Sequence, residues 1–422
     1  MTTAPHPLGS PEQHRPEPAL EEPTLVPALK AIRASSEWLL LGLVFVVILE
    51  LSCRVEDWIT YRTPLASRAA SLNDLVIRDA DGMHGRANVR LQKWKMNSLG
   101  TRGPEASTTP AVGTLRVIAV GASETFGLRE SPDREYPRQL EDSLNARVSR
   151  GGCGNASMHF EVLNAGFAGM TLPTIEQDVR LRLSRLRPDI VVIYPTPAQY
   201  LQDELPLVAA PDSAPGHGLP ASNAVYPRFL NRFREQLKQV VPVAVLTRIR
   251  ARQAMSEVES HPDGWRFETL PLDRLTQFEN DLRRLVGAIQ TLGMQPVLVT
   301  HANIFMTDQP RNSAELVSWE KFYPRATGEV IVALDSAARL ATLRVGREAS
   351  VVTIDAAARL SKAPRSSFGD FVHFTDTGAS LVADEVSGGV MAAAHAMGRC
   401  APSASSHHRS PESVSVPIAS AR

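Results

Sequence analysis

The chain has 422 residues, of which 43% are hydrophobic and 21% charged, as is typical of a globular protein. Its 45 basic and 45 acidic residues cancel, so no net field would attract nucleic acid. The three cysteines, Cys53, Cys153 and Cys400, have no metal-ligand spacing and define no disulfide framework, although a bridge between Cys153 and Cys400 stays open. Composition therefore predicts a globular protein with no metal pattern among its cysteines and no nucleic-acid partner.

The N-terminal part of the chain predicts a disordered segment followed by a transmembrane helix. Residues 1–36 are rich in Pro, Glu and His and poor in large apolar residues, which favours disorder. Residues 37–54 contain an apolar run that starts at Trp38 and is interrupted only by Glu50. A spanning helix needs about 20 apolar residues, with roughly 17 as a lower bound, so this run is short. Trp38 and Trp58 would anchor its two ends at the membrane interfaces.

Three interpretations of this run stay open, and an uncleaved signal-anchor is the favoured one. A cleaved secretion signal lacks a small-x-small site, and the lipoprotein-like Leu-Ser-Cys at residues 51–53 follows Glu50, where an apolar residue is wanted. The remaining alternative is a buried core helix. Lys30 and Arg33 precede the run and Arg54 follows it, which is a weak positive-inside signal. We expect a single-pass membrane protein whose main domain is extracytoplasmic, in the periplasm.

Beyond this helix, a linker and lead-in are expected over residues 55–113, and the main domain over residues 114–398. In the main domain short apolar runs alternate with amphipathic patterns of helical period. Strands are expected at 115–120, 160–163, 189–194, 295–300 and 351–354, and helices at 136–148, 174–186, 275–292, 329–345 and 378–397. Residues 203–265 are expected to form an insertion that begins rich in Pro, Ala, Gly and Ser and continues with a helix-like stretch. The Ser- and Pro-rich residues 399–422 are expected to be a disordered tail.

This alternation predicts the α/β class, as a three-layer α/β/α sandwich with a central five-stranded parallel sheet behind one N-terminal transmembrane helix. In such open sheets, binding and catalytic residues lie beyond the carboxyl ends of the strands. Polar residues that directly follow an expected strand are therefore the candidates for chemistry.

The first expected strand ends in Gly121-Ala-Ser-Glu-Thr-Phe-Gly127. A serine directly after a buried strand presents its hydroxyl at the active edge of the sheet, and the turn can aim backbone N–H groups at one point, as an oxyanion requires. Ser123 is thus a candidate nucleophile, although a serine at a strand-to-helix turn more commonly caps the helix.

A histidine that could serve Ser123 lies 250 residues downstream, in the loop before the last expected helix. That loop reads Phe368-Gly-Asp-Phe-Val-His-Phe-Thr-Asp-Thr-Gly378. A general base must accept the proton of the serine, and its second ring nitrogen needs an acceptor that fixes the tautomer. Asp370 precedes His373 by three residues, so one turn can supply both groups. The alternative for His373 is a solvated loop histidine that caps the following helix.

Taken together, these segments resemble the SGNH/GDSL hydrolase family over residues 115–398. Residues 121–127 look like the first block of the family, GDSxTxG, and Asn164-Ala-Gly-Phe-Ala-Gly-Met-Thr171 looks like its second block. Asp370-Phe-Val-His373 matches the Asp-x-x-His block. The stretch from Asn97 to Glu105 is similar to a lead-in of membrane-anchored bacterial members. The resemblance implies the flavodoxin-like SGNH fold.

The resemblance also implies roles for individual residues. Ser123 would be the nucleophile, His373 the general base and then the general acid, and Asp370 the residue that orients His373. The backbone N–H groups of Ser123 and Gly169 would donate to the oxyanion. No metal or other cofactor is implied.

Two departures from the family pattern bear on the chemistry. Ala122 stands where the first block has an aspartate that is not a member of the triad. The asparagine of the third block would fall at about Ala198, and the adjacent Gln199 is the expected substitute for its amide. The loss of one oxyanion donor can cost about 10²–10³ in rate, so slow turnover or a differently built site stays open.

Residues that would contact the substrate follow the fourth expected strand, in Thr300-His301-Ala-Asn303. We expect His301 and Asn303 to line the acyl or acceptor pocket and Glu124 to face the substrate. The alternative for His301 is a loop histidine bonded to backbone.

The predicted function is that of a membrane-anchored serine esterase or O-acyltransferase. Its substrate would carry an ester on a glycan or lipid, such as the O-acetyl groups of a cell-envelope polysaccharide. The alternative, motivated by Ala198, is a catalytically degenerate protein that binds glycan or organises an envelope assembly.

Overall fold

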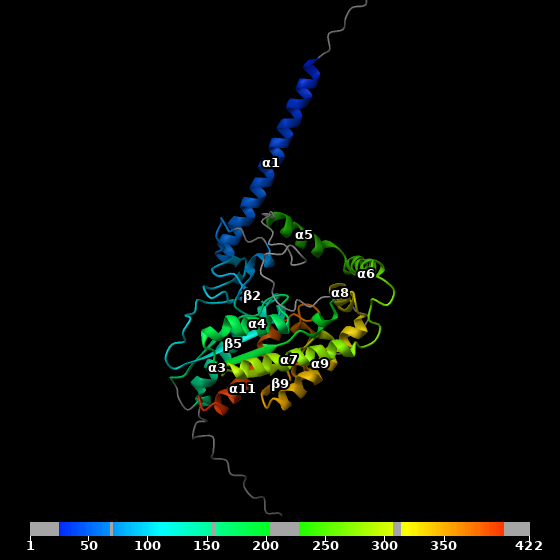
Figure 1. Ribbon diagram of the computed structural model, residues 1–422. Helices are drawn as coiled ribbons and strands as arrows, with labels where there is room; N and C mark the ends of the chain where they lie inside the picture. Colours follow the sequence, from blue (N-terminus) through cyan, green and yellow to red (C-terminus); the bar gives the residue numbers. More distant parts are fainter. Residues whose placement is uncertain (1–24, 68–70, 154–156, 203–227, 307–313, 401–422) are drawn as a thin grey trace, which may run out of the picture. The chain divides into compact units, whose positions relative to one another are not determined.

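The structure, a computed structural model, describes residues 25–67, 71–153, 157–202, 228–306 and 314–400 (Figure 1). The expected disorder of the first 24 residues, the start of the expected insertion and most of the expected C-terminal tail lie outside these ranges. Contacts divide the chain into two units, Met1–Cys53 and Arg54–Arg422.

The first described element is a long helix, α1 (Leu25–Tyr61). It is longer at both ends than the expected 37–54, and residues 25–36, expected to be disordered, are helical. Adding residues to an existing helix costs little once the first turn has formed, and Pro27 falls in the first turn, where proline is tolerated. Ser36–Tyr61 is long and apolar enough to cross a membrane, a test that an N-terminal signal sequence also passes.

The second unit is built on one five-stranded parallel sheet, as the sequence predicted. The strands, in spatial order, are β6 (His159–Asn164), β5 (Thr114–Gly121), β7 (Ile190–Tyr194), β8 (Gln295–Val299) and β9 (Val352–Ile354). Nearly every side chain of β5 and β7 is buried, because helices cover both faces of the sheet. The strand order reverses between β5 and β7, and this switch point is where open α/β sheets place their sites.

Two sets of helices cover the faces of the sheet and make the expected three layers (Figure 1). One face carries α3 (Tyr136–Arg147), α10 (Ala356–Leu360) and α11 (Asp376–Ala396). The other face carries α4 (Leu172–Leu181), α7 (Leu272–Thr291) and α9 (Gly328–Glu348). Alternate residues of β5 pack into the two layers: Val117 faces the core of α3 and α11, and Ile118 faces the core of α4 and α7.

The lead-in before the sheet is part of the same folded unit and not a linker alone. It contains two short antiparallel pairs, β1 (Val76–Asp79) with β2 (Gly82–Gly85), and β3 (Arg90–Leu91) with β4 (Trp94–Lys95). Leu75, Met83, Leu91 and Met96 are buried in the core that also holds Ile118. Because these apolar side chains pack on the sheet layer, the boundary expected at residue 114 is not a boundary of the fold.

The described part of the expected insertion is helical. It contains α5 (Arg228–Val240) and α6 (Val243–Glu259), and Pro242 separates the two because proline cannot continue a helix interior. Helix α6 packs against α8 (Ala314–Phe322), a helix that the sequence analysis did not predict. Ion pairs join helix α5 to the end of α1, and one of them links Arg228 to Asp57 at 2.8 Å.

A disulfide joins Cys153 to Cys400, with their Cα atoms 4.9 Å apart. Cys153 follows the end of α3, and Cys400 follows α11, so the bridge ties the two helices that pack together on one face of the sheet. The bridge that the sequence left open is therefore present.

Candidate active site

The candidate nucleophile stands on a tight turn at the end of β5. Ser123 begins the one-turn helix α2 (Ser123–Phe126), and Gly127, in the left-handed region at φ 85°, ends it. A side chain at Gly121 would meet Thr125 Oγ1 at 2.2 Å and the Tyr194 carbonyl at 2.6 Å, so only glycine lets the turn pack this closely.

Two side chains from other segments hold the carbonyl groups of this turn. Arg102, in the lead-in, donates to the carbonyl of Phe126 and, at 2.7 Å, to that of Gly127. Asn164, at the end of β6, donates from Nδ2 to the carbonyl of Thr125 at 2.9 Å. The buried Arg102 and Asn164 thereby fix the turn that carries Ser123.

The candidate base lies on a closed loop before α11. The backbone of Gly369 donates to the carbonyl of His373 at 2.7 Å, and Phe368 pairs with Phe374 across the loop. Asp370 Oδ1 accepts the backbone N–H of His373 at 3.0 Å, so one carboxylate organises both the loop and the ring above it.

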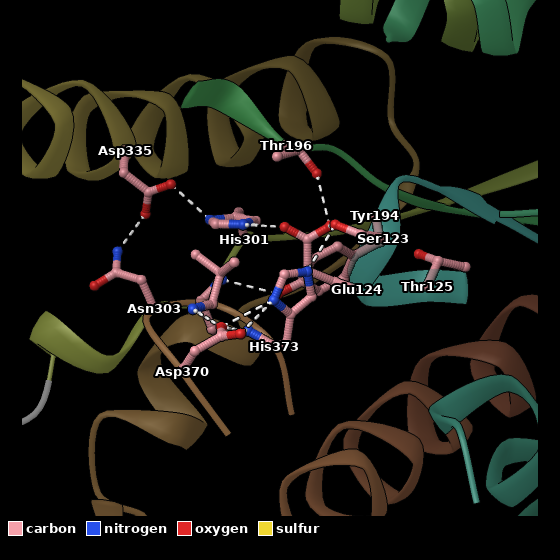
Figure 2. A network of polar contacts seen from close by, with 12 residues as sticks. Ser123, Glu124, Thr125, Tyr194, Thr196, His301, Asn303, Asp335, Asp370 and His373 are labelled. Carbon is pink, nitrogen blue, oxygen red and sulfur yellow. Dashed lines mark hydrogen bonds and ion pairs between the residues drawn. The ribbon is translucent and has the colours of Figure 1, made fainter. Parts of the chain in front are cut away.

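Figure 2 shows that Ser123, His373 and Asp370 form one continuous chain of hydrogen bonds. Ser123 Oγ lies 2.8 Å from His373 Nε2, and His373 Nδ1 lies 2.8 Å from Asp370 Oδ1. With the ring proton on Nδ1, Nε2 is free to accept the serine proton. Ser123 and His373, 250 positions apart in the sequence, are thus brought together with Asp370 in the order that nucleophile, base and orienting acid require.

The surroundings of His373 favour its charged form. Burial lowers its pKa, but the hydrogen bond and charge of Asp370, followed by the charge of Glu124, outweigh burial and raise the pKa above the usual value of 6.5. Burial would raise the pKa of Asp370, yet the hydrogen bond and charge of His373 hold that pKa well below its usual range. Arg129 Nε, 3.0 Å from Asp370 Oδ2, acts in the same direction.

Two of the three expected oxyanion donors are backbone N–H groups, and their role stays a prediction. The N–H of Ser123 opens α2, and Gly169 has φ 85° with open space around the position of a side chain. Gln199 lies in the buried turn Pro197–Leu201. Within the described residues its side chain forms no hydrogen bond to Ser123, His373 or Glu124, so its role as a third donor stays a prediction.

Glu124, His301 and Asn303, expected to contact substrate, are instead each 1% exposed and joined in a buried network. His301 lies between two carboxylates, with Nε2 3.2 Å from Glu124 Oε1 and Nδ1 2.6 Å from Asp335 Oδ1. Asn303 donates to Asp335 Oδ2 at 2.6 Å (Figure 2). Because these contacts occupy their polar atoms, the expectation that the three line an open pocket is corrected.

The network places a cation between two anions. Burial opposes the charge of His301, but Asp335 and Glu124 outweigh it and raise its pKa to about 10. Burial would raise the pKa of Glu124, yet the hydrogen bond and charge of His301 hold that pKa below its usual value. The site therefore holds an ionised carboxylate directly beside the serine.

An aromatic cluster borders the other side of His373. The ring of Phe371 lies 6.3 Å from that of His373 and 5.6 Å from those of Trp319 and Phe322. Phe322, at the end of α8, is 66% exposed, so the cluster reaches the surface. It provides an apolar wall beside the candidate base.

Within the described residues, no group of three or more His, Cys, Asp or Glu side chains is arranged to hold a metal ion.

No family model matches the chain, and no curated protein matches it. Among solved structures, it is similar to a protein described as lipolytic, of the G-D-S-L family, from Desulfitobacterium hafniense, with 12% identity over 64% of this chain and 97% of that one and a TM-score of 0.35. It is also similar to an acetylxylan esterase from Geobacillus stearothermophilus, with 15% identity, 64% and 92% coverage and a TM-score of 0.36. A third is an α/β hydrolase from the metagenome of Lake Arreo, with 13% identity, 67% and 95% coverage and a TM-score of 0.37. These sequence identities and TM-scores are too low to assign a function to the chain.

Sequence reasoning missed several residues of the site. Thr196 follows β7 and donates from Oγ1 to Glu124 Oε2 at 3.1 Å. Asp335 lies on the buried face of α9, where an acidic residue among apolar ones is the signal that could have found it. Arg102 and Arg129 have no sequence signal of their own, because each acts through contacts with a distant segment.

Proposed function

We propose that the chain is a serine esterase or O-acyltransferase whose nucleophile is Ser123, whose base is His373 and whose orienting acid is Asp370. One observation carries this proposal: Ser123 Oγ lies 2.8 Å from His373 Nε2 while Asp370 holds Nδ1 of the same ring. A serine that merely capped a helix would not require a histidine and an aspartate aligned behind it.

The chemistry follows from this arrangement. Ser123 Oγ attacks the ester carbonyl as its proton moves to His373 Nε2, and the N–H groups of Ser123 and Gly169 stabilise the oxyanion. The imidazolium then protonates the departing alkoxide, which leaves an acyl group on Oγ. An acceptor, either water or a sugar hydroxyl, loses its proton to Nε2 and attacks the acyl carbon. The bond from the acyl carbon to Oγ then breaks, and Nε2 returns the proton to Ser123.

The proposed location is the extracytoplasmic face of a membrane. The apolar helix Ser36–Tyr61 supports membrane attachment, and the Cys153–Cys400 disulfide supports an oxidising compartment such as the periplasm. A tethered enzyme in that compartment meets cell-envelope polymers, so the proposed substrate is an ester of an envelope glycan, with O-acetyl groups as the first choice.

The test is covalent labelling of the purified full-length chain with a fluorophosphonate probe, together with turnover of an activated acetyl ester. We expect labelling of wild type and of Ser184→Ala, which removes a hydroxyl that donates to the Arg180 carbonyl away from the site, and none of Ser123→Ala. Equal labelling of wild type and Ser123→Ala, or no labelling of either, contradicts the proposal. Added sugar acceptors distinguish the two activities, because transfer yields an acylated sugar and hydrolysis only the free acid.

A second candidate function is glycan binding without turnover. It is motivated by Ala198, which stands where the resemblance expects an oxyanion donor, and by Gln199, whose side chain makes no hydrogen bond to the described site. A chain that binds an acetylated glycan equally well as wild type and as Ser123→Ala, and that resists the probe, would favour this candidate.

A further inference from the structure

The hydroxyl of Ser123 has two acceptors within hydrogen-bond distance. Its Oγ lies 2.8 Å from His373 Nε2 and 3.2 Å from Glu124 Oε2 (Figure 2). A hydroxyl has one proton, so the two hydrogen bonds are alternatives. When His373 is neutral, Ser123 donates to Nε2. When His373 is an imidazolium, Nε2–H donates to Oγ, and the hydroxyl proton of Ser123 turns to Glu124.

Glu124 is fixed for this second arrangement. Thr196 donates to the same oxygen, Oε2, at 3.1 Å, which sets the rotation of the carboxylate. The other oxygen, Oε1, faces His301, and Asp335 holds the far nitrogen of that ring. Two carboxylates and one imidazolium leave one net negative charge, buried directly behind the nucleophile.

Such a buried charge set is poorly explained by stability alone. Removing three ionisable groups from water is costly, and well-packed apolar residues of similar volume often stabilise a fold as well or better. The set nevertheless contacts one group of the proposed catalytic machinery, the Ser123 hydroxyl.

We propose that Glu124 is a positioning residue that holds the Ser123 hydroxyl while His373 is protonated and stabilises the imidazolium, with His301 and Asp335 keeping Glu124 ionised. The inference deepens the proposed function and rests on it for the chemistry. In the acylation step the Oγ–H bond breaks, the Nε2–H bond forms, and Oγ bonds to the ester carbon as the carbonyl π pair moves to its oxygen. The new positive charge on the ring lies between Asp370 on one side and Glu124 on the other. The ester C–O bond then breaks, and the alkoxide leaves with the proton from Nε2.

Among the described residues, four charged groups on surrounding segments interact electrostatically with His373. Asp370 lies on its own loop, Glu124 on α2, and Arg129 and Glu130 on the loop after α2. Of these, only Glu124 contacts both the serine and a second histidine. Removing its charge, while keeping its shape, therefore isolates its effect on the serine–histidine pair.

The experiment measures the pH dependence of fluorophosphonate labelling in the full-length chain for wild type and Glu124→Gln. The labelling rate should rise as His373 loses its proton, with a midpoint above about pH 6.5 in wild type. In Glu124→Gln we expect this midpoint to fall by roughly half to one pH unit, because the neutral amide no longer favours the imidazolium. For the acetyl ester, kcat should fall and KM should change less than about twofold, since the buried Glu124 does not contact substrate.

Two controls separate this role from a structural one. Asp384→Asn removes a carboxylate that is 65% exposed on α11 and should leave the midpoint in place. Thr196→Val removes a hydrogen bond to Glu124 but no charge, so it should slow labelling without moving the midpoint. A purely structural Glu124 would lower the melting temperature of Glu124→Gln and leave its pH profile like that of wild type, and this result overturns the proposal.

Two further measurements keep the proposal testable if Glu124→Gln does not fold or if the chain is not an esterase. His301→Gln does not touch Ser123, yet it raises the pKa of Glu124 and should move the midpoint in the same direction. NMR titration of His373, assigned with His373→Asn, reads the effect of Glu124 without any turnover. Absence of labelling in wild type contradicts the proposed function, whereas an unchanged His373 titration in both variants contradicts the role of Glu124.

Discussion

Asp370 accepts a hydrogen bond from His373 Nδ1, and a neutral side chain at this position would not fix the same tautomer of the ring. In Asp370→Asn the amide oxygen can still accept the backbone N–H of His373, so we expect the loop to fold. The amide lacks the charge that pairs with the imidazolium and can hold the ring in the wrong tautomer, which in such triads costs roughly 10⁴ in kcat. The measurement is kcat for an activated acetyl ester. Arg129→Gln, which removes a 57% exposed partner of Asp370, should cost less than about tenfold, and equal losses in the two variants would contradict this assignment.

Glu130 makes stability depend on pH near neutrality. Its side chain is buried, and within the described residues its Oε1 accepts no hydrogen bond. Burial raises its pKa to about 7, above the usual value of 4.5. Its folded-state pKa is raised, so its contribution to stability is complete below about pH 4.5 and is lost as the pH rises through 7.

Glu130→Gln should remove that dependence, because the amide resembles the protonated carboxyl. Between pH 5 and pH 8 the free energy of unfolding of wild type should fall by a few kcal/mol more than that of the variant, on the order expected for this pKa shift. Thermal unfolding at the two pH values measures the difference. If the free energy of unfolding changes equally with pH in the two proteins, Glu130 does not titrate in this range.

At the scale of elements, helix α5 depends on a buried ion pair with the end of α1. Arg228 is 2.8 Å from Asp57, and the two side chains are 5% and 1% exposed. Asp57→Asn removes the charge that this buried guanidinium faces, which can cost about 3–5 kcal/mol. We expect faster limited proteolysis within residues 228–240. Glu56→Gln, at a site 64% exposed, should change the free energy of unfolding by less than about 1 kcal/mol, and similar digestion of both variants would contradict the prediction.

The elements that the sequence predicted well are those with a strong period or a local motif. The runs around Val117 and Val192 are apolar without interruption because both faces of their strands are covered, and this pattern needs no tertiary knowledge. The turn at Ser123 and the Asp370–His373 loop were found because each is encoded within a few residues. Helix α8 and the packing of the lead-in have no comparable local period.

The whole site was only partly predictable, because its electrostatics come from segments that meet only in the fold. Glu124 and His301 were singled out from their places after β5 and β8, but their roles depend on Asp335, which α9 brings from another layer. Spacing along the chain carries no measure of burial, so the sequence analysis expected Glu124 to face the substrate. Because Glu124, His301 and Asp335 are each 1% exposed or less, their charges act on one another and on the serine in a medium of low dielectric constant.

For the whole molecule, the disulfide makes the free energy of unfolding depend on whether the protein matures in an oxidising compartment. Cys153 and Cys400 are 247 residues apart, and closing so long a loop restricts the unfolded chain. Cys400→Ser should lower the free energy of unfolding by about 2–4 kcal/mol, seen as a lower melting temperature, while Cys53→Ser should have a small effect because Cys53 lies outside the bridge. Thiol titration of the unreduced, denatured wild type should find one reactive thiol of the three cysteines. Three thiols in protein isolated from its native compartment would mean that the domain matures in a reducing environment, and the proposed extracytoplasmic location would then fail together with the stability prediction.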